Sequence, residues 1–229
     1  MLEQILEKES LTKDDLIYLM KLTKQDDLNK LYEKAYSIKE KYVGRKAYYR
    51  GLIEFSNRCV KNCYYCGIRS GNENVERFDM SGDEIIKMAK WAYENNYGSV
   101  TLQSGERQDK NFEKFVKDMI LDIKEVSEGK LGLTLCLGEQ TEDIYREWFE
   151  AGGHRYLLRI ETTNEELYKV IHPDNNIHSF QKRVDCLKTL KKIGYQVGTG
   201  VMIGLPGQTE EDLVNDILFF EKMDIDMIG

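Results

Sequence analysis

The sequence predicts an α/β protein, specifically an incomplete TIM-like barrel of parallel strands with about six βα units and an N-terminal helical extension. From Ala47 onwards, short β-rich runs alternate with amphipathic stretches. Repetition of strand, helix and strand at this spacing gives parallel strands joined by right-handed crossovers. Six strand candidates fit into the 229 residues, whereas a closed eight-stranded barrel typically takes about 250 residues. The pattern therefore leaves two architectures, an unfinished barrel and an open doubly wound sheet.

The first 45 residues are expected to be helical and to form an extension (1–45) before the barrel core (46–229). Thr12 begins a capping pattern with Asp15, and apolar residues follow it at helical spacing. A second segment, over about 26–42, carries an apolar stripe. The stripe consists of Leu28, Leu31, Ala35, Ile38 and Tyr42.

The core elements follow in order along the chain. The strand candidates are 48–55, 99–104, 131–137, 155–160, 196–204 and, as the weakest, 225–229. One helix begins after Ser81, where Glu84 completes a capping box. Further helices are expected over 111–126, 141–151, 164–171, 180–193 and 209–223. The last of them should bury Leu213, Val214, Ile217 and Leu218. Because the sixth strand is reached as the chain ends, we expect a shortened form of a longer barrel protein.

Composition and charge exclude several classes of function. The net charge of −7 and the mixed signs of the charged residues do not suggest a nucleic-acid partner. No stretch approaches the roughly 20 apolar residues of a membrane span, and the start, "MLEQILEKES", has no apolar signal region. We therefore expect a cytoplasmic protein, in which clustered cysteines are more often metal-binding or catalytic than disulfide-bonded.

Three of the five cysteines lie within "FSNRCVKNCYYCGIR", namely Cys59, Cys63 and Cys66. The spacing Cys-x₃-Cys-x₂-Cys places them on a loop, because no regular helix or strand brings three such sulfurs together. A structural zinc site needs four protein ligands, and the fourth would come from His172, His178 or Cys186. A four-iron cluster held by three cysteines leaves one iron open, as catalytic metal sites do. The spacing favours the cluster over zinc.

Carboxylates follow three successive strand candidates. Glu106, Glu139 and Glu161 each come at a strand end, and such ends converge in a barrel. The alternative is that each acid caps a helix or faces water. Arg159 stands inside the apolar run "YLLRIE", where a charge is costly unless it is paired. A structural ion pair and an anchor for a substrate anion both remain open for it.

Two other features are expected to carry no chemistry. The run "GTGVMIGLPGQT" does not match a dinucleotide-binding or P-loop pattern. The three histidines, His154, His172 and His178, lack metal-ligand spacing and are expected to be surface or loop residues.

The cysteine spacing, with Tyr65 beside the last cysteine, resembles that of the radical S-adenosylmethionine (SAM) family. The resemblance implies a [4Fe–4S] cluster held by Cys59, Cys63 and Cys66, whose fourth iron is chelated by SAM. It also implies reductive cleavage of SAM to methionine and a 5′-deoxyadenosyl radical.

Five motifs in the same order resemble HydE, the [FeFe]-hydrogenase maturase group of this family. They are "YRGLIEFSNRCVKNCYYCGIR", "LQSGE", "LCLGE", "YLLRIETTN" and "GLPGQT". The resemblance implies a SAM site formed by Tyr65, Gly105, Glu106, Glu161, Arg183 and Met227. It implies that Thr134 and Arg159 line an inner anion-binding cavity.

The same resemblance implies an organometallic substrate, an iron–cysteine complex carrying carbon monoxide and cyanide. HydG and HydF are the implied partners, and a ferredoxin or flavodoxin is the implied electron donor. Biotin synthase and methylornithine synthase share the cysteine pattern but resemble this chain less closely at "LQSGE" and "YLLRIET". A radical SAM enzyme of either type and a zinc-stabilised, non-catalytic interaction module are the alternatives.

Overall fold

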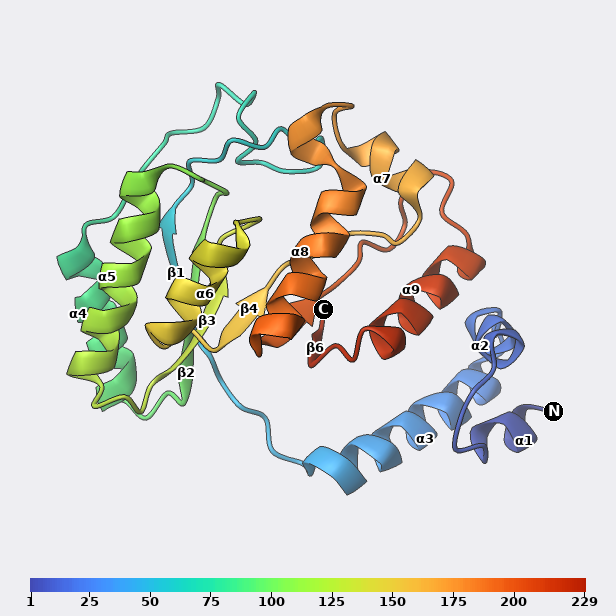
Figure 1. Cartoon of the computed structure of the whole chain (residues 1–229). Helices are drawn as coiled ribbons and strands as arrows, with labels where there is room; N and C mark the ends of the chain where they lie inside the picture. The colour runs from blue at the N-terminus through green and yellow to red at the C-terminus, as the bar shows by residue number, and fades with distance from the viewer.

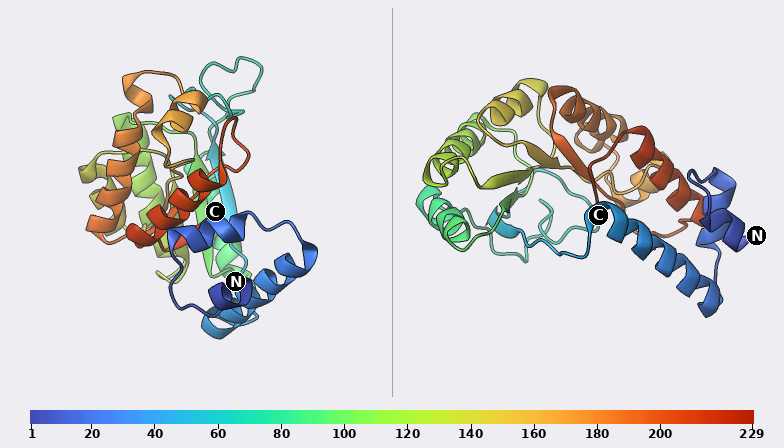
Figure 2. Two further views of the ribbon diagram at one scale, coloured as in Figure 1. Left: turned by 90° about the vertical axis from the view of Figure 1, so that its right-hand side faces the viewer. Right: turned by 90° about the horizontal axis from the view of Figure 1, so that it is seen from below.

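The computed structural model describes residues 1–229 and contains one sheet of six parallel strands in the order β1-β2-β3-β4-β5-β6. The strands are β1 (Gly51–Ser56), β2 (Ser99–Ser104), β3 (Gly132–Cys136), β4 (Arg155–Leu157), β5 (Gln196–Thr199) and β6 (Met227–Ile228). They follow an arc with the helices outside it, and β6 does not pair with β1 (Figure 2). The sheet is therefore an open, incomplete barrel, as predicted.

The helices follow the expected order closely. They are α1 (Leu2–Leu6), α2 (Lys13–Met20), α3 (Gln25–Val43), α4 (Gly82–Glu94), α5 (Lys110–Val126), α6 (Glu142–Glu150), α7 (Glu165–Ile171), the 3₁₀ turn η1 (Asn176–His178), α8 (Phe180–Ile193) and α9 (Glu210–Lys222) (Figure 1). The capping boxes predicted at Thr12 and Ser81 are present. No helix is long and apolar enough to cross a membrane.

Strands β4 and β5 are shorter than expected because the chain leaves the ladder early. After β4 the backbone turns at Glu161, whose φ is 68°. After β5, Gly200 lies so close to Gly229 that an added Cβ would meet its carbonyl oxygen at 2.1 Å. The two segments touch again only at a single bridge between Glu161 and Val201. Because both strands end early, the backbone turns already at their carboxyl ends, where Glu161 lies.

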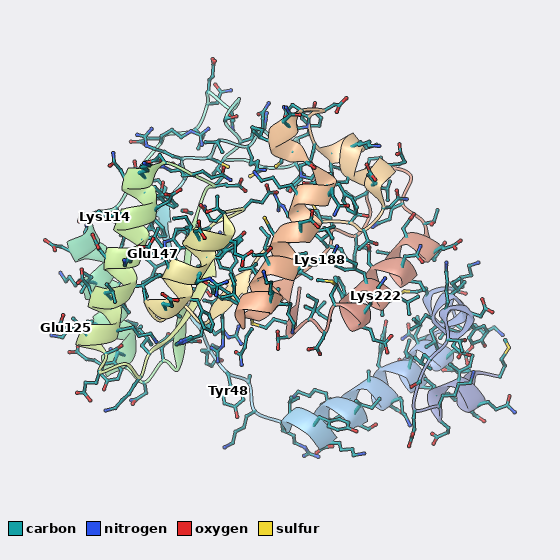
Figure 3. The ribbon with its side chains drawn as sticks, in the orientation of Figure 1. Tyr48, Lys114, Glu125, Glu147, Lys188 and Lys222 are labelled. Carbon is teal, nitrogen blue, oxygen red and sulfur yellow. The ribbon has the colours of Figure 1, made fainter.

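The main core lies between the convex face of the sheet and helices α4, α5, α6, α8 and α9, whereas α7 packs in a small separate cluster with Leu205. The main core contains 28 buried residues, among them Leu133 and Leu135 of β3 and five side chains of α5. Burying one such side chain contributes roughly 1.5–3 kcal/mol. Because side chains alternate across a strand, Thr134 and Cys136 of β3 face the concave side. The charged Lys114, Lys188 and Lys222 point outward from α5, α8 and α9 (Figure 3).

Helices α1–α3 lie beside this core (Figure 1). Helix α2 meets α9, and Lys13 pairs with Glu211 at 2.6 Å. The helix predicted over about 26–42 is confirmed as α3, but its apolar stripe is not covered: α3 buries no residue, and Ile38 and Tyr42 are exposed. Only the start of α3 has an apolar partner, through Leu31. The division of the chain at residues 45 and 46 stays a prediction.

The burial expected for α9 is only partly right. Val214 is fully buried, whereas Leu213, Ile217 and Leu218 are half-buried. Helix α9 contacts α2 and follows the last full strand before the open edge of the sheet, where β6 has only two residues, so its side chains are less completely covered.

Candidate functional site

The three clustered cysteines lie on the long loop that leaves the carboxyl end of β1, at the upper edge of Figure 1. All three are free thiols; Cys63 is buried, and Cys59 and Cys66 are half-buried. Burial raises the pKa of Cys63 to about 11. The charge of Cys66 also raises the pKa of Cys59, and the charges of Cys59 and Cys66 raise the pKa of Cys63. The sequence therefore folds locally into a loop that gathers three thiols.

The first half of this loop is attached to the end of β2. The backbone N–H of Glu106 donates to Sγ of Cys59 at 3.3 Å, and the N–H of Val60 donates to the Glu106 carbonyl at 2.9 Å. Gly105 lies against the loop so closely that an added Cβ would meet the Arg58 carbonyl oxygen at 2.3 Å. Gly105 and Glu106, both expected near SAM, thus lie directly beside Cys59.

The second half of the loop is attached to the segment that contains α7 and η1. The N–H of Tyr64 donates to the Ile171 carbonyl at 3.0 Å, and the N–H of Asn62 donates to Nε2 of His178 at 2.8 Å. The hydroxyl of Tyr65 lies 3.3 Å from Nε2 of His172. These contacts hold the part of the loop that carries Cys63 and Cys66.

His172 and His178 were expected to be surface or loop residues. The expectation of a surface position is wrong, because the two side chains are only 2% and 5% exposed. Nδ1 of His172 lies 2.9 Å from the Tyr168 carbonyl, which leaves Nε2 to accept from Tyr65. Burial lowers the pKa of His172 to about 4 and also lowers that of His178. Both rings are therefore neutral at pH 7. His154 is exposed, as predicted.

A buried group of four charges lies beneath the loop; we call it the charge quartet, and it comprises Lys61, Glu106, Glu139 and Arg183. Nζ of Lys61 lies 2.9 Å from Glu139 and 3.3 Å from Glu106. Nε of Arg183 lies 2.6 Å from Glu139, and its Nη2 lies 3.9 Å from Glu106. All four are less than a tenth exposed. Two anions and two cations share this site.

The environment separates the pKa values of the two carboxyl groups in the quartet. Burial, and then the charge of Glu139, raise the pKa of Glu106. Burial alone would raise the pKa of Glu139 too, but Arg183 and Lys61 outweigh it and lower that pKa. Glu139 therefore gives up its proton more readily than Glu106 does, and it is the carboxylate in contact with both cations.

Glu161 is 6% exposed and holds a left-handed backbone conformation that non-glycine residues rarely adopt. Such conformations persist where the surroundings impose them, and they gather at functional sites. Burial raises the pKa of Glu161, against the charges of Arg183 and Arg159. The alternative in which the three strand-end acids face water is wrong, because Glu106, Glu139 and Glu161 are all buried.

The two residues expected in the inner cavity face the concave side of the sheet. Oγ1 of Thr134 is buried and has no hydrogen-bond partner. The expectation that Arg159 is a charge within a strand is wrong, because β4 ends at Leu157 and Arg159 is exposed. Its neighbours Leu158 and Ile160 pack in the core, so Arg159 points the opposite way, toward Cys136 and Glu161. Its guanidinium is in no salt bridge.

Met227 lies apart from the other expected site residues. It is on β6, and Sδ accepts a hydrogen bond from Arg50, which precedes β1, at 3.2 Å. Its side chain also lies beside Gly198 of β5. The structure thus gathers Tyr65, Gly105, Glu106, Glu161 and Arg183 around the thiols and leaves Met227 outside.

The residues present fit an iron–sulfur cluster better than a single zinc ion. No three His, Cys, Asp or Glu side chains are arranged to hold one metal ion. Each iron of a cluster takes its own thiolate, so the three sulfurs need not meet at one point. The ring nitrogens of His172 and His178 are already engaged, and Cys186 faces the Gln140 carbonyl at 3.8 Å. The N–H of Glu106 on Cys59 is a contact that also suits a ligating thiolate.

Reasoning from sequence missed Lys61 and the two histidines, and it left Glu139 without a partner. The strand-end position of Glu139 was a usable signal, and the lysine between two loop cysteines was another. Their pairing joins positions 78 residues apart, which no local pattern encodes.

The fold and the cysteine loop define a radical SAM domain, and the chain belongs to the radical SAM superfamily, whose profile matches residues 53–220. Among curated relatives it is 42% identical over 225 residues to the [FeFe] hydrogenase maturase subunit HydE of Thermotoga maritima, covering 98% of this chain and 62% of that protein. It is 26% identical to the 3-methylornithine synthase of Methanosarcina acetivorans, covering 99% and 63%. The chain thus spans less than two thirds of the length of these relatives.

Solved structures agree on the fold. The crystal structure of methylornithine synthase (PylB) matches with a TM-score of 0.87 at 26% identity, over 99% of this chain and 66% of that one. The structure of HydG, a maturase of the [FeFe]-hydrogenase, matches with a TM-score of 0.84 at 23% identity, over 99% and 52%. At that identity the second likeness concerns the fold alone.

Proposed function

We propose that this chain is a radical SAM enzyme that binds a [4Fe–4S] cluster through Cys59, Cys63 and Cys66 and reductively cleaves SAM. The observation that carries the proposal is the arrangement of three free thiols on a loop fixed at the carboxyl ends of the strands. Those ends are where sites are built in parallel barrels. The free state of all five cysteines suits a reducing, cytoplasmic setting.

When bound, the cluster would supply the electron that breaks a carbon–sulfur bond of SAM. The protein's part is to bind and orient. Glu161 and Tyr65 offer a carboxylate and a hydroxyl beside the thiols, and the pKa of Tyr65 is raised by burial and by the charge of Glu161. The hydroxyl is therefore neutral; its one proton is donated to Nε2 of His172, so toward SAM its oxygen can accept a hydrogen bond. Gly105 leaves room for close approach, since its hydrogen replaces a side chain that would strike the loop.

We further propose a HydE-like role, the assembly of the [FeFe]-hydrogenase di-iron subcluster. The 42% identity to HydE supports it. The concave face fits a small anionic or organometallic substrate, because Thr134 has an unpartnered hydroxyl and Arg159 a guanidinium without a salt bridge. In this role HydG would provide the substrate, HydF would receive the product, and a ferredoxin or flavodoxin would provide the electron.

Anaerobic reconstitution tests the cofactor. The chain, supplied with iron and sulfide, should bind about four irons and release 5′-deoxyadenosine from SAM when it is reduced. Cys63→Ala should lose the cluster. Cys186→Ala, a buried free cysteine on α8, is the matched control and should keep it. A colourless protein that holds one zinc per chain would contradict the proposal.

A second candidate is chemistry like that of methylornithine synthase, favoured by the TM-score of 0.87 to that structure. Incubating the reduced enzyme with the amino-acid precursor of 3-methylornithine or with an iron–cysteine complex separates the two. Substrate-dependent 5′-deoxyadenosine with the amino-acid precursor alone would favour the second candidate.

A further inference from the structure

Lys61 is a buried cation in the middle of the cysteine loop. It stands two residues after Cys59 and two before Cys63, and it is 4% exposed. A buried lysine is costly unless its charge is paired and its donors are used. The partners of the Lys61 ammonium group therefore indicate the role of this side chain.

One set of contacts attaches Lys61 to the strand ends. Its Nζ lies 3.3 Å from Glu106, which follows β2, and 2.9 Å from Glu139, which follows β3. Glu106 is also the residue whose backbone pairs with Cys59 and Val60. The side chain of Lys61 thus fixes the same residue that holds the first half of the loop.

The other set attaches Lys61 to the segment that holds the second half. Its Nζ also donates to the carbonyl of Ile177 in η1, next to His178, which accepts from Asn62. Its own carbonyl accepts from Ser70, further along the loop, at 2.8 Å. Lys61 is thus the loop side chain that contacts both anchors, the strand ends and η1.

We propose that Lys61 is a positioning residue that fixes the distance between Cys59 and the pair Cys63 and Cys66 before any metal binds. The proposal rests on the cluster site proposed above. One ammonium group reaches two strand ends and η1, so the two halves of the loop cannot move independently while Lys61 is in place. The thiols are then preorganised, and assembly of the cluster need not order the loop.

Hydrogen exchange of the metal-free full chain tests this claim without the cluster. The N–H groups of Val60, Asn62 and Tyr64 donate to the two anchors. In Lys61→Met we expect these amides to exchange at least about tenfold faster than in the wild type, which corresponds to about 1.4 kcal/mol. Amides of α5 should keep their wild-type rates. Equal acceleration of loop and α5 amides would indicate a purely structural role and overturn the proposal.

Two further variants keep the test decisive. Lys182→Met removes a partly exposed cation that lies 3.7 Å from the same Glu139 but is not on the loop, and it should leave the loop amides unchanged. The double variant Lys61→Met/Glu139→Gln leaves one anion and one cation in the quartet, so it can fold even if the single variant does not. Its loop amides should still exchange fast. Wild-type protection in the double variant would mean that Lys61 only balances charge, which would overturn the proposal.

A spectroscopic readout follows in the reconstituted protein. We expect Lys61→Met to bind less iron than the wild type, and to lose the change that SAM causes in the electron paramagnetic resonance (EPR) spectrum of the reduced cluster. An unchanged spectrum together with unchanged exchange would contradict the proposal. If the wild type itself takes up no iron, the proposed function fails, while the exchange result still decides whether Lys61 positions the loop.

Discussion

At the scale of single residues, the charge quartet shows how four costly groups become tolerable together. Each of Lys61, Glu106, Glu139 and Arg183 is buried, and each has an opposite charge within 4 Å. Removing one partner from such a group leaves a buried charge uncompensated, which typically costs about 3–5 kcal/mol.

Arg183→Met is therefore expected to lower the free energy of unfolding by about 3–5 kcal/mol. Arg183 bonds Glu139 at 2.6 Å and the Arg159 carbonyl at 2.9 Å, and methionine replaces neither contact. Urea unfolding of the metal-free chain measures the change. The control Arg146→Met breaks an exposed pair with Glu142 on α6 and should cost no more than about 1 kcal/mol. Equal losses in both variants would contradict the role given to the quartet.

Stability should fall as the pH drops from 6.5 toward 4, because of His172. Burial lowers the pKa of this ring from 6.5 to about 4. Between those values the unfolded chain binds a proton that the folded chain does not, so lower pH favours unfolding. We expect His172→Gln to lose less stability than the wild type between pH 7 and pH 5, by about 1–2 kcal/mol. Parallel pH profiles for the two proteins would show that His172 takes up its proton equally in the folded and unfolded chains, and they would contradict this prediction.

Residue types whose chemistry is local could be read from the sequence, and residues whose partners are distant could not. The three cysteines and the capping residues Thr12 and Ser81 act within a few positions of themselves. The burial of His172 and His178 depends on the cysteine loop, more than 100 residues away. Arg159 was expected in a strand because its run is apolar, but the turn at Glu161 ends that strand first.

At the scale of elements, the end of β2 lies in close contact with the cysteine loop. An added Cβ at Gly105 would lie 2.3 Å from the Arg58 carbonyl oxygen and 2.7 Å from Cβ of Cys59. Neither neighbour is the flexible end of a side chain, so the backbone itself would have to move.

Gly105→Ala should therefore displace the loop and reduce iron uptake by at least about half, with a loss of stability of about 1–3 kcal/mol from overpacking. Gly98→Ala is the matched control, since an added Cβ there meets nothing within 4 Å. It should bind iron like the wild type. Iron analysis and thermal unfolding check both variants; full iron uptake by Gly105→Ala would argue against close contact at this point.

The order and type of the elements were predictable because each helix on the sheet has its own starting signal and apolar face. Helix α8 matches its expected bounds, and the caps of α4 and α9 were expected. The lengths of β4 and β5 were not, since they depend on where neighbouring strands stop pairing. The exposure of the stripe on α3 was not predictable either, because an apolar stripe is buried only where a partner covers it.

At the scale of the whole molecule, packing is uneven between the sheet and the first helices. Helix α5 buries five residues in the main core, whereas the 19-residue α3 buries none. Local stability follows buried apolar contact. The amides of α3 should therefore exchange at least about a hundredfold faster than those of α5, as mass spectrometry of the full chain would measure. Equal protection would indicate that α3 is covered in solution.

The central claim is that three loop thiols hold an iron–sulfur cluster whose remaining iron is open to SAM. The most direct measurement is the EPR spectrum of the anaerobically reconstituted, reduced chain, recorded with and without SAM and read together with its iron content. Our account predicts about four irons per chain and a spectrum that SAM alters, both lost in Cys63→Ala. A full cluster whose spectrum does not respond to SAM would mean that a fourth protein ligand occupies that iron, and it would contradict the account.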